Sequence, residues 1–329
     1  REILGNSLSN YKYQMFLKKQ PKVLLLGQSV MLQFRDFMFE PYQKDFYNTG
    51  LMARNAKDLN YVLDLIEEGK VRKPELVLLG VDLSFVLRNT ELDDIEWTRN
   101  YPEDRALSAK SHLKGIQRLF LDPKLREIPE IDAGFGKAGM IGRGYRNDGS
   151  YRHRPEILEY LKDSVYFDGD LINYLKNKTA PFIEPFEYDA AKAEELLSTL
   201  SRFKELNIEL LLYVPPYSEV YFDEAIQDPV FSSFWKDFMA FQEILIKRGF
   251  SIIPFCTTAQ LGLTNDYMVD AEHPSEVMNA LQLRSYVQSG KAKGKILNSL
   301  TFKEVDKLLK AERTLPISFL KDSLDQGLI

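Results

Sequence analysis

Short apolar runs and amphipathic segments alternate along both ends of the chain. Five runs rich in Val, Ile, Leu, Phe and Tyr have the length and continuity of strands buried on both faces. These predicted strands are residues 22–26, 45–48, 75–79, 209–214 and 250–253. Segments with helical periodicity or helical composition are residues 30–39, 56–68, 189–206, 231–248, 276–289 and 300–313. Strands that alternate with helices predict right-handed crossovers, so we expect an α/β protein: a three-layer α/β/α sandwich around a five-stranded parallel sheet.

The periodicity degrades between about residues 88 and 187. This stretch contains charged segments, scattered aromatic residues and the glycine-rich sequence GFGKAGMIGRGYRNDGSYRHRP. We interpret it as an irregular or helical insertion, a lid or cap over the sheet, within one domain that spans residues 1–329. Residues 300–329 are expected to form a C-terminal helical tail.

Composition excludes several classes of protein. The 329 residues carry a net charge of -5, so no basic excess indicates nucleic-acid binding. A single cysteine, Cys256, excludes an intramolecular disulfide and a cysteine-rich zinc site, and the three histidines are dispersed. We therefore expect no metal and no cofactor. No apolar run reaches about 18 residues, the length of a membrane span. Because the chain begins at Arg1 rather than Met, we expect a fragment or processed form, and a preceding signal peptide or anchor stays open.

Two short motifs carry the candidate chemistry. Gly27-Gln28-Ser29 follows the first predicted strand, and Asp270-Ala271-Glu272-His273 lies near the other end of the chain. Ligands of open α/β sheets bind beyond the carboxyl ends of the strands, where Ser29 falls. A carboxylate three residues before a histidine can hold the imidazole by Nδ1–H and leave Nε2 for a serine.

Each motif also has a simpler interpretation. Ser29 alone is explained as the cap of a following helix, and His273 alone as a solvated loop residue. The two motifs together favour a Ser29–His273–Asp270 triad, which would be typical of ester cleavage or acyl transfer.

These motifs resemble those of the SGNH/GDSL hydrolase superfamily. That family has its nucleophile in a Gly-Asp-Ser block after the first strand, and an Asp-x-x-His near the C-terminus. Ser29 matches the nucleophile, Gly50 matches the glycine after the second strand, and Asp270 and His273 match the last block. The resemblance covers about residues 21–86 and 189–290. It implies a flavodoxin-like sheet and an oxyanion hole formed by the N–H groups of Ser29 and Gly50.

Two positions depart from the family pattern. Gln28 replaces the aspartate that usually precedes the serine. Asp82 falls where the family has an oxyanion-binding asparagine, and an ionised carboxylate cannot donate a hydrogen bond to an oxyanion. A working oxyanion hole would need Asp82 to be protonated or turned away, or a substitute donor, of which Ser84 is one.

The segment Arg143–Arg154 is a second candidate site. Its basic residues, which include Arg146, Arg152, His153 and Arg154, are suited to bind an anionic glycan, a phosphate or a carboxylate. The glycines before it would let the loop move as a lid. The alternative is a solvated, flexible loop. A Gly-Lys-Ser/Thr ending is absent, so a phosphate-binding P-loop is not supported.

Two further features are Pro215-Pro216-Tyr217 at the end of the fourth predicted strand and His273-Pro274-Ser275 after Asp270. With them the chain resembles a divergent bacterial branch of the superfamily that modifies cell-envelope polysaccharides. That branch includes the alginate O-acetyltransferases and the proteins of teichoic-acid D-alanylation. The resemblance implies an extracytoplasmic or periplasmic location, with a membrane anchor ahead of residue 1 as one form, and leaves a cytoplasmic location open. It implies an acylated glycan or other ester as substrate, and a membrane-bound acyl-donor protein as a partner.

The sequence therefore favours a serine esterase or O-acyltransferase that acts on an acylated cell-envelope carbohydrate. The alternative is a catalytically inactive relative that binds a glycan or a protein. A nucleotide-binding domain is a third hypothesis, which the absence of Gly-x-Gly-x-x-Gly after the first strand disfavours.

Overall fold

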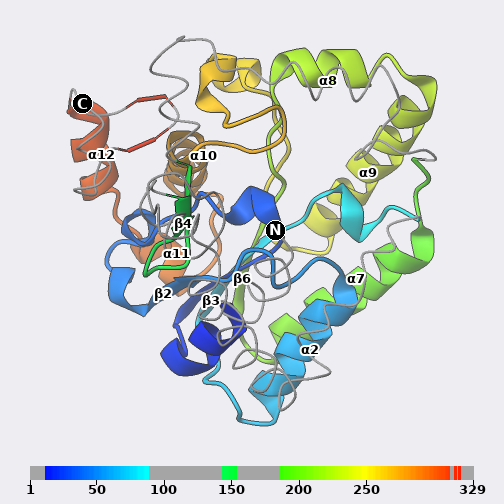
Figure 1. Cartoon of the computed structure of the whole chain (residues 1–329). Coiled ribbons are helices and arrows are strands. Elements are labelled where there is room, and N and C mark those ends of the chain that lie inside the picture. The colour runs from blue at the N-terminus through cyan, green and yellow to red at the C-terminus, as the bar shows by residue number, and fades with distance from the viewer. Residues whose placement is uncertain (1–11, 89–142, 154–185, 312–314, 317, 320–329) are drawn as a thin grey trace, which may run out of the picture.

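The core of the protein is one parallel β-sheet. The computed structural model describes residues 12–88, 143–153, 186–311, 315–316 and 318–319 (Figure 1). The sheet has five strands, all parallel, in the order β2-β1-β3-β6-β7. The strands are β1 (Val23–Leu26), β2 (Phe46–Asn48), β3 (Leu76–Gly80), β6 (Glu209–Tyr213) and β7 (Ser251–Ile253). The predicted α/β class and all five predicted strands are confirmed, and the order is flavodoxin-like.

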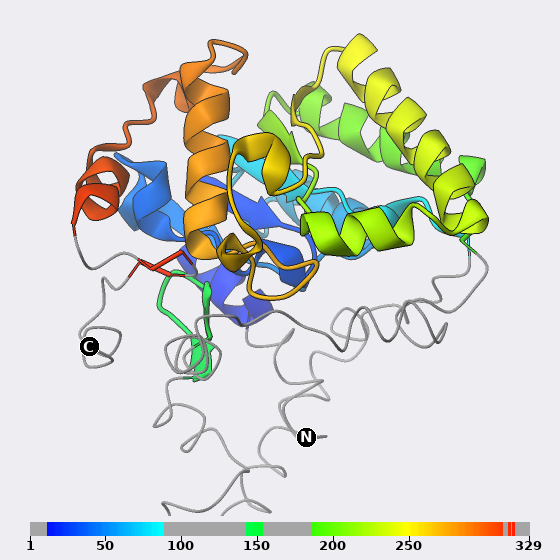
Figure 2. The same cartoon turned by 90° about the horizontal axis from the view of Figure 1, so that it is seen from above.

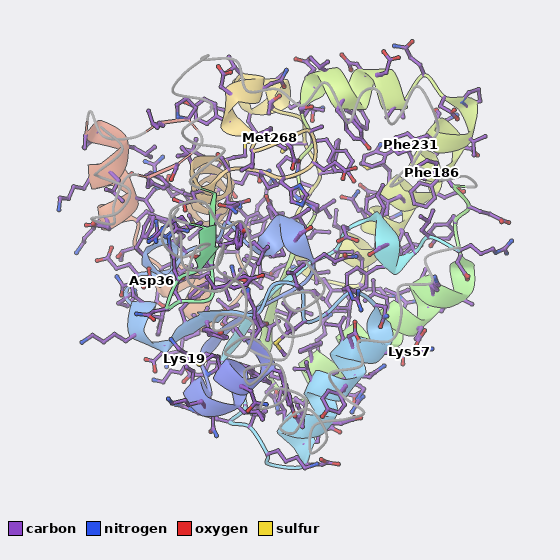
Figure 3. The ribbon with its side chains drawn as sticks, in the orientation of Figure 1. Lys19, Asp36, Lys57, Phe186, Phe231 and Met268 are labelled. Carbon is purple, nitrogen blue, oxygen red and sulfur yellow. The ribbon has the colours of Figure 1, made fainter. Side chains whose placement is uncertain are left out.

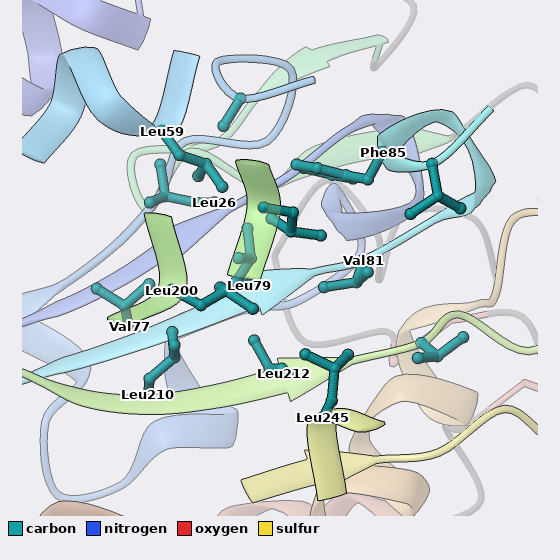
Figure 4. Packing of buried hydrophobic residues seen from close by; sticks show 14 of the residues in the cluster. Leu26, Leu59, Val77, Leu79, Val81, Phe85, Leu200, Leu210, Leu212 and Leu245 are labelled. Carbon is teal, nitrogen blue, oxygen red and sulfur yellow. The ribbon is translucent and has the colours of Figure 1, made fainter. Parts of the chain in front are cut away.

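Helices cover both faces of this sheet (Figures 1 and 2). One face is covered by α2 (Ala56–Glu67), α7 (Ala190–Glu205) and α9 (Pro229–Lys247). The other is covered by α10 (Glu276–Gln288), α11 (Lys295–Ser299) and α12 (Lys303–Lys310). Side chains of successive strand residues alternate between the two cores: Leu24 and Leu26 pack on the first face, and Val23 and Leu25 on the second. Figure 4 shows the first core, where Leu26 and Leu79 lie among residues from the helices.

Polar caps and one proline fix where the main helices begin. The Asp189 carboxylate accepts hydrogen bonds from two N–H groups of the first turn of α7. Asp228 does the same for α9, whose first residue is Pro229. Ser275 caps α10 by accepting from the Met278 N–H. Figure 3 shows Phe186 beside Phe231 of α9, and their ring centroids lie 5.1 Å apart.

Residues 30–39 do not form the single helix that the sequence predicts. They form two 3₁₀ turns, η1 (Ser29–Met31) and η2 (Asp36–Phe39). Distant groups take the carbonyls that an α-helix would use: the Tyr151 N–H donates to Leu32 O at 2.9 Å. The Asn48 side-chain amide donates to two further carbonyls of this segment at 2.8 and 2.9 Å. Tertiary contacts therefore replace helical hydrogen bonds here.

Further helices differ from the prediction. The sequence analysis did not predict α8 (Glu219–Ala225), which follows β6. The predicted helix at 300–313 is shorter in the structure and corresponds to α12, which begins at Lys303 because Thr301 forms a β-bridge with Glu40, with a hydrogen bond of 2.8 Å from the Thr301 N–H to Glu40 O. The short helix α11, which ends before residue 300, was not predicted. Among the described residues, none of the helices has the length and apolarity needed to cross a bilayer.

Part of the predicted insertion is a β-hairpin. Strand β4 (Arg143–Tyr145) pairs antiparallel with β5 (Tyr151–His153), and the turn between them is packed against the end of β2, where the Asn48 N–H donates to Asp148 O at 2.8 Å. The two ends of the insertion also meet, since Leu87 and Tyr188 form a β-bridge. The remainder of the insertion, residues 89–142 and 154–185, lies outside the described residues, so its role as a lid stays a prediction.

A buried ion cluster joins four parts of the fold at the start of α10. The Glu276 carboxylate lies 3.4 Å from Arg35 Nη1 and 3.0 Å from Arg146 Nη2, and the exposed fraction of each of these three side chains is between 2% and 6%. Glu276 Oε2 also accepts from Ser318 Oγ at 3.2 Å and from the Phe319 N–H at 3.3 Å. Glu276 thereby ties the hairpin, the segment after Ser29 and the C-terminal segment to α10.

Candidate active site

A sharp turn at the end of β1 presents Ser29. Gly27 has φ +133°, and a Cβ there would lie 2.8 Å from Met31 Cγ and 3.2 Å from the backbone of Gly80. Only glycine tolerates this backbone conformation so close to the neighbouring strand. The chain therefore turns immediately after β1, and Ser29 begins the 3₁₀ turn η1 at the carboxyl edge of the sheet.

A closed loop after β7 presents His273. The Val269 N–H donates to His273 O at 2.8 Å, and Met268, labelled in Figure 3, forms a β-bridge with Pro274. Inside the loop, Asp270 Oδ1 accepts from the His273 N–H at 2.8 Å and from the Glu272 N–H at 3.0 Å. These hydrogen bonds fix the backbone on both sides of the imidazole.

The structure brings Ser29, His273 and Asp270 into one hydrogen-bonded chain. His273 Nε2 lies 2.8 Å from Ser29 Oγ, although the residues are 244 positions apart. His273 Nδ1 lies 2.8 Å from each Asp270 carboxylate oxygen. The tautomer with its proton on Nδ1 satisfies both contacts, since Nδ1–H donates to Asp270 and Nε2 accepts from the serine hydroxyl. The His273 and Asp270 side chains keep 27% and 23% of their surface exposed, so solvent reaches the site.

The surrounding charges favour a protonated imidazole. Burial lowers the pKa of His273, but the Asp270 carboxylate, with smaller contributions from Glu272 and Asp82, raises it above its ordinary value. Burial alone would raise the pKa of Asp270, and the imidazolium with the hydrogen bonds around it brings that pKa below its ordinary value. The pair is therefore poised for His273 to accept a proton from Ser29.

Glu272 belongs to the site and was not predicted from the sequence. Burial raises the pKa of its carboxyl group from 4.5 to about 7, and Glu272 Oε1 accepts a hydrogen bond from the Tyr221 hydroxyl at 2.9 Å. Tyr221 is fully buried in α8, the helix that the sequence analysis did not find. The position of Glu272 beside His273 in the motif was the available signal, but its partner could not be read from the sequence.

Asp82, just after the end of β3, is surrounded by hydrogen-bond donors. Asp82 caps the 3₁₀ turn η4 (Leu83–Phe85), where its Oδ1 accepts from the Ser84 N–H at 2.9 Å. The Ser84 hydroxyl also donates to Asp82 Oδ1, so this predicted substitute donor is already engaged. Burial raises the pKa of Asp82 from 3.8 to about 6, which leaves it largely ionised at neutral pH.

Gly50 lies next to the serine turn, as the resemblance implies. The neighbouring Leu51 N–H donates to Gly27 O at 2.8 Å, and a Cβ on Gly50 would lie 3.3 Å from Gln28 O. The Gly50 N–H itself donates to Asn48 Oδ1 at 2.8 Å. For Gly50 to bind an oxyanion, this N–H would have to be shared with Asn48 or released by it.

The predicted basic site is divided by the structure. The Arg146 guanidinium is buried beside Glu276 and donates to Tyr151 O at 2.8 Å, so the fold itself occupies it. Arg152 is partly buried in β5, opposite Gly144. The backbone of His153 pairs with Arg143 in the hairpin, and Arg154 lies outside the described residues. Substrate binding by these four residues stays a prediction.

Other chemistry has less support in the described part of the chain. There, no three His, Cys, Asp or Glu side chains are grouped to hold a metal ion. Burial raises the pKa of the Cys256 thiol to about 11, which disfavours the reactive thiolate.

The sequence has no detectable match among known families. No family model matches the chain, and no curated protein is significantly similar to it. A fold alone does not establish a function, so the function of this chain is inferred from the residues of its site.

Proposed function

We propose that this protein is an SGNH-like serine esterase or O-acyltransferase. The single observation that supports this most is the hydrogen-bonded chain from Ser29 through His273 to Asp270, at the carboxyl edge of a doubly wound sheet. A capping or solvated role explains Ser29 or His273 alone. It does not explain why both ring nitrogens of His273 have the partners that a triad requires.

The proposed reaction proceeds through an acyl-enzyme. Ser29 Oγ attacks the acyl carbonyl, and its proton passes to His273 Nε2. The tetrahedral intermediate collapses when the C–O bond to the alcohol breaks, and His273 returns the proton to the leaving alkoxide. Asp270 orients the imidazole and stabilises its protonated form throughout. The N–H groups of Ser29 and Gly50 are the proposed oxyanion donors.

The second half of the reaction decides between hydrolysis and transfer. Water attacks the acyl-enzyme in an esterase, and a sugar hydroxyl attacks it in a transferase. The resemblance to the cell-envelope branch supports an acylated carbohydrate as the substrate and an extracytoplasmic location. It also supports a membrane-bound acyl-donor protein as a partner if the protein is a transferase.

Labelling with a fluorophosphonate probe tests the proposed triad. The purified chain should react, and Ser29→Ala and His273→Ala should each abolish labelling. Ser233→Ala, which changes an exposed serine on α9, is the matched control and should label like the parent. Full labelling of the Ser29→Ala variant would exclude Ser29 as the nucleophile.

The inactive binding module is the second candidate, and the position of Asp82 favours it. An ionised carboxylate at the position of the family's oxyanion-binding asparagine would oppose an oxyanion. This alternative predicts that no form of the chain is labelled. It also predicts that glycan affinity survives Ser29→Ala and is lost in Arg152→Ala and Arg154→Ala.

A further inference from the structure

The weakness of the proposed oxyanion hole lies at the end of β3. The place where the family has an asparagine amide is held by Asp82, whose Oδ1 only accepts hydrogen bonds in this structure. Its donors are the Ser84 N–H, the Ser84 hydroxyl and the side-chain amide of Gln28. Asp82 and the Ser84 hydroxyl are thus hydrogen-bonded to each other, and neither side chain donates a hydrogen bond to a ligand in this arrangement.

Gln28 reaches this position from the end of the neighbouring strand. It directly precedes Ser29, and its half-buried side chain extends from the turn after β1 towards the turn after β3. Gln28 Nε2 lies 3.4 Å from Asp82 Oδ1 and also donates to Ser84 Oγ. An amide donor is therefore present beside the position where the family's asparagine amide would be.

The geometry of the amide leaves one N–H for a ligand. A side-chain amide nitrogen carries two hydrogens that point in different directions in one plane. The two acceptors of Gln28, Ser84 Oγ and Asp82 Oδ1, adjoin because the serine hydroxyl donates to that same carboxylate oxygen. One N–H of Gln28 can serve both acceptors, since they lie next to each other. The described part of the chain offers Nε2 no further acceptor, which leaves its second N–H for a ligand.

We propose that Gln28 is a catalytic residue whose Nε2–H donates to the oxyanion in place of the family's asparagine. This inference rests on the proposed function, since it assumes that Ser29 forms a tetrahedral intermediate. Asp82 is then a positioning residue: its carboxylate holds the Gln28 amide with the nitrogen at the carboxyl edge of the sheet. Such a fixed donor needs no reorganisation when charge develops in the transition state.

Rates of labelling by the fluorophosphonate probe test this role, because the attack on phosphorus also places negative charge on an oxygen. Gln28→Ala removes the donor, and Gln28→Glu keeps the shape while replacing the amide with an acceptor. Each should lower the second-order rate constant by about 10²- to 10³-fold, the effect of losing one oxyanion donor. The double variant Gln28→Ala/Asp82→Asn should recover part of this loss, because the second substitution supplies an asparagine amide at the family position.

The outcomes separate this inference from the proposed function. If Gln28→Ala and Gln28→Glu react at the parent rate while Ser29→Ala does not react, the role of Gln28 is overturned and the triad stands. A loss in Gln28→Ala that the double variant does not recover also overturns it, since a packing defect gives that pattern. A parent chain that does not react overturns both. Circular dichroism of each variant, with Ser233→Ala as the control, checks that the fold is retained.

Discussion

Glu272→Gln is expected to change how the stability of this protein depends on pH. The substitution keeps the size of the side chain, and the amide oxygen can still accept the hydrogen bond from the Tyr221 hydroxyl. It removes a carboxyl group whose pKa burial raises from 4.5 to about 7. The neighbouring titratable groups, Asp270, His273 and Asp82, stay in place.

The magnitude follows from proton linkage. Between pH 4.5 and about 7 the unfolded chain has released the Glu272 proton while the folded chain retains it. The unfolded state then binds fewer protons, so the free energy of unfolding falls as the pH rises. The difference between the two pKa values corresponds to about 3 kcal/mol at 1.36 kcal/mol per pH unit. The parent loses this contribution by about pH 8, and Glu272→Gln has none to lose.

Urea denaturation measures the effect. Unfolding followed by tryptophan fluorescence is suitable, because Trp235 is buried in the aromatic core of α9. We compare the free energy of unfolding of Glu272→Gln with that of the parent at each pH. The variant minus the parent should be about 3 kcal/mol larger at pH 8 than at about pH 4.5. Asp223→Asn changes an exposed carboxylate on α8 and serves as the control, which should not reproduce the effect of Glu272→Gln. If the free energy of unfolding has the same pH dependence in the parent and in Glu272→Gln, the reasoning is refuted.

Three further substitutions have expected outcomes. Asp270→Asn removes the main group that raises the pKa of His273, so the acidic side of the pH profile of probe labelling should move to lower pH. The labelling rate at neutral pH should fall by about 10³- to 10⁴-fold. Glu276→Ala leaves two buried guanidinium groups without their counter-charge and should lower the free energy of unfolding by about 3–5 kcal/mol in urea titrations. Phe238→Ala empties a fully buried site in α9 and should lower it by about 3–5 kcal/mol, whereas the exposed Ile246→Ala should cost far less.

The strands were predictable because their signal is local. A strand buried on both faces has to be a continuous apolar run, and β1, β3 and β6 are such runs whatever the rest of the chain does. The segment 30–39 shows where local signals end. Its composition suits a helix, but the Asn48 side chain and the Tyr151 N–H take its carbonyls, and both come from distant parts of the sequence.

The same division applies to the basic segment. Its composition indicated either an anion-binding loop or a solvated one, and the structure gives Arg146 a third role, as the buried partner of Glu276. Those two residues are 130 positions apart. Nothing in the sequence around either of them shows that they pair.

By itself, the sequence determined the α/β class, the strands, the place of Ser29 directly after the first strand and the loop that contains Asp270 and His273. These features follow from burial, turns and the fixed geometry of parallel sheets, all of which act over a few residues. Only the tertiary structure decided that His273 Nε2 meets Ser29 Oγ, that Tyr221 holds Glu272 and that Gln28 bonds to Asp82. Such contacts depend on the order of strands in the sheet and on the path of each loop, and those are set by packing across the whole chain.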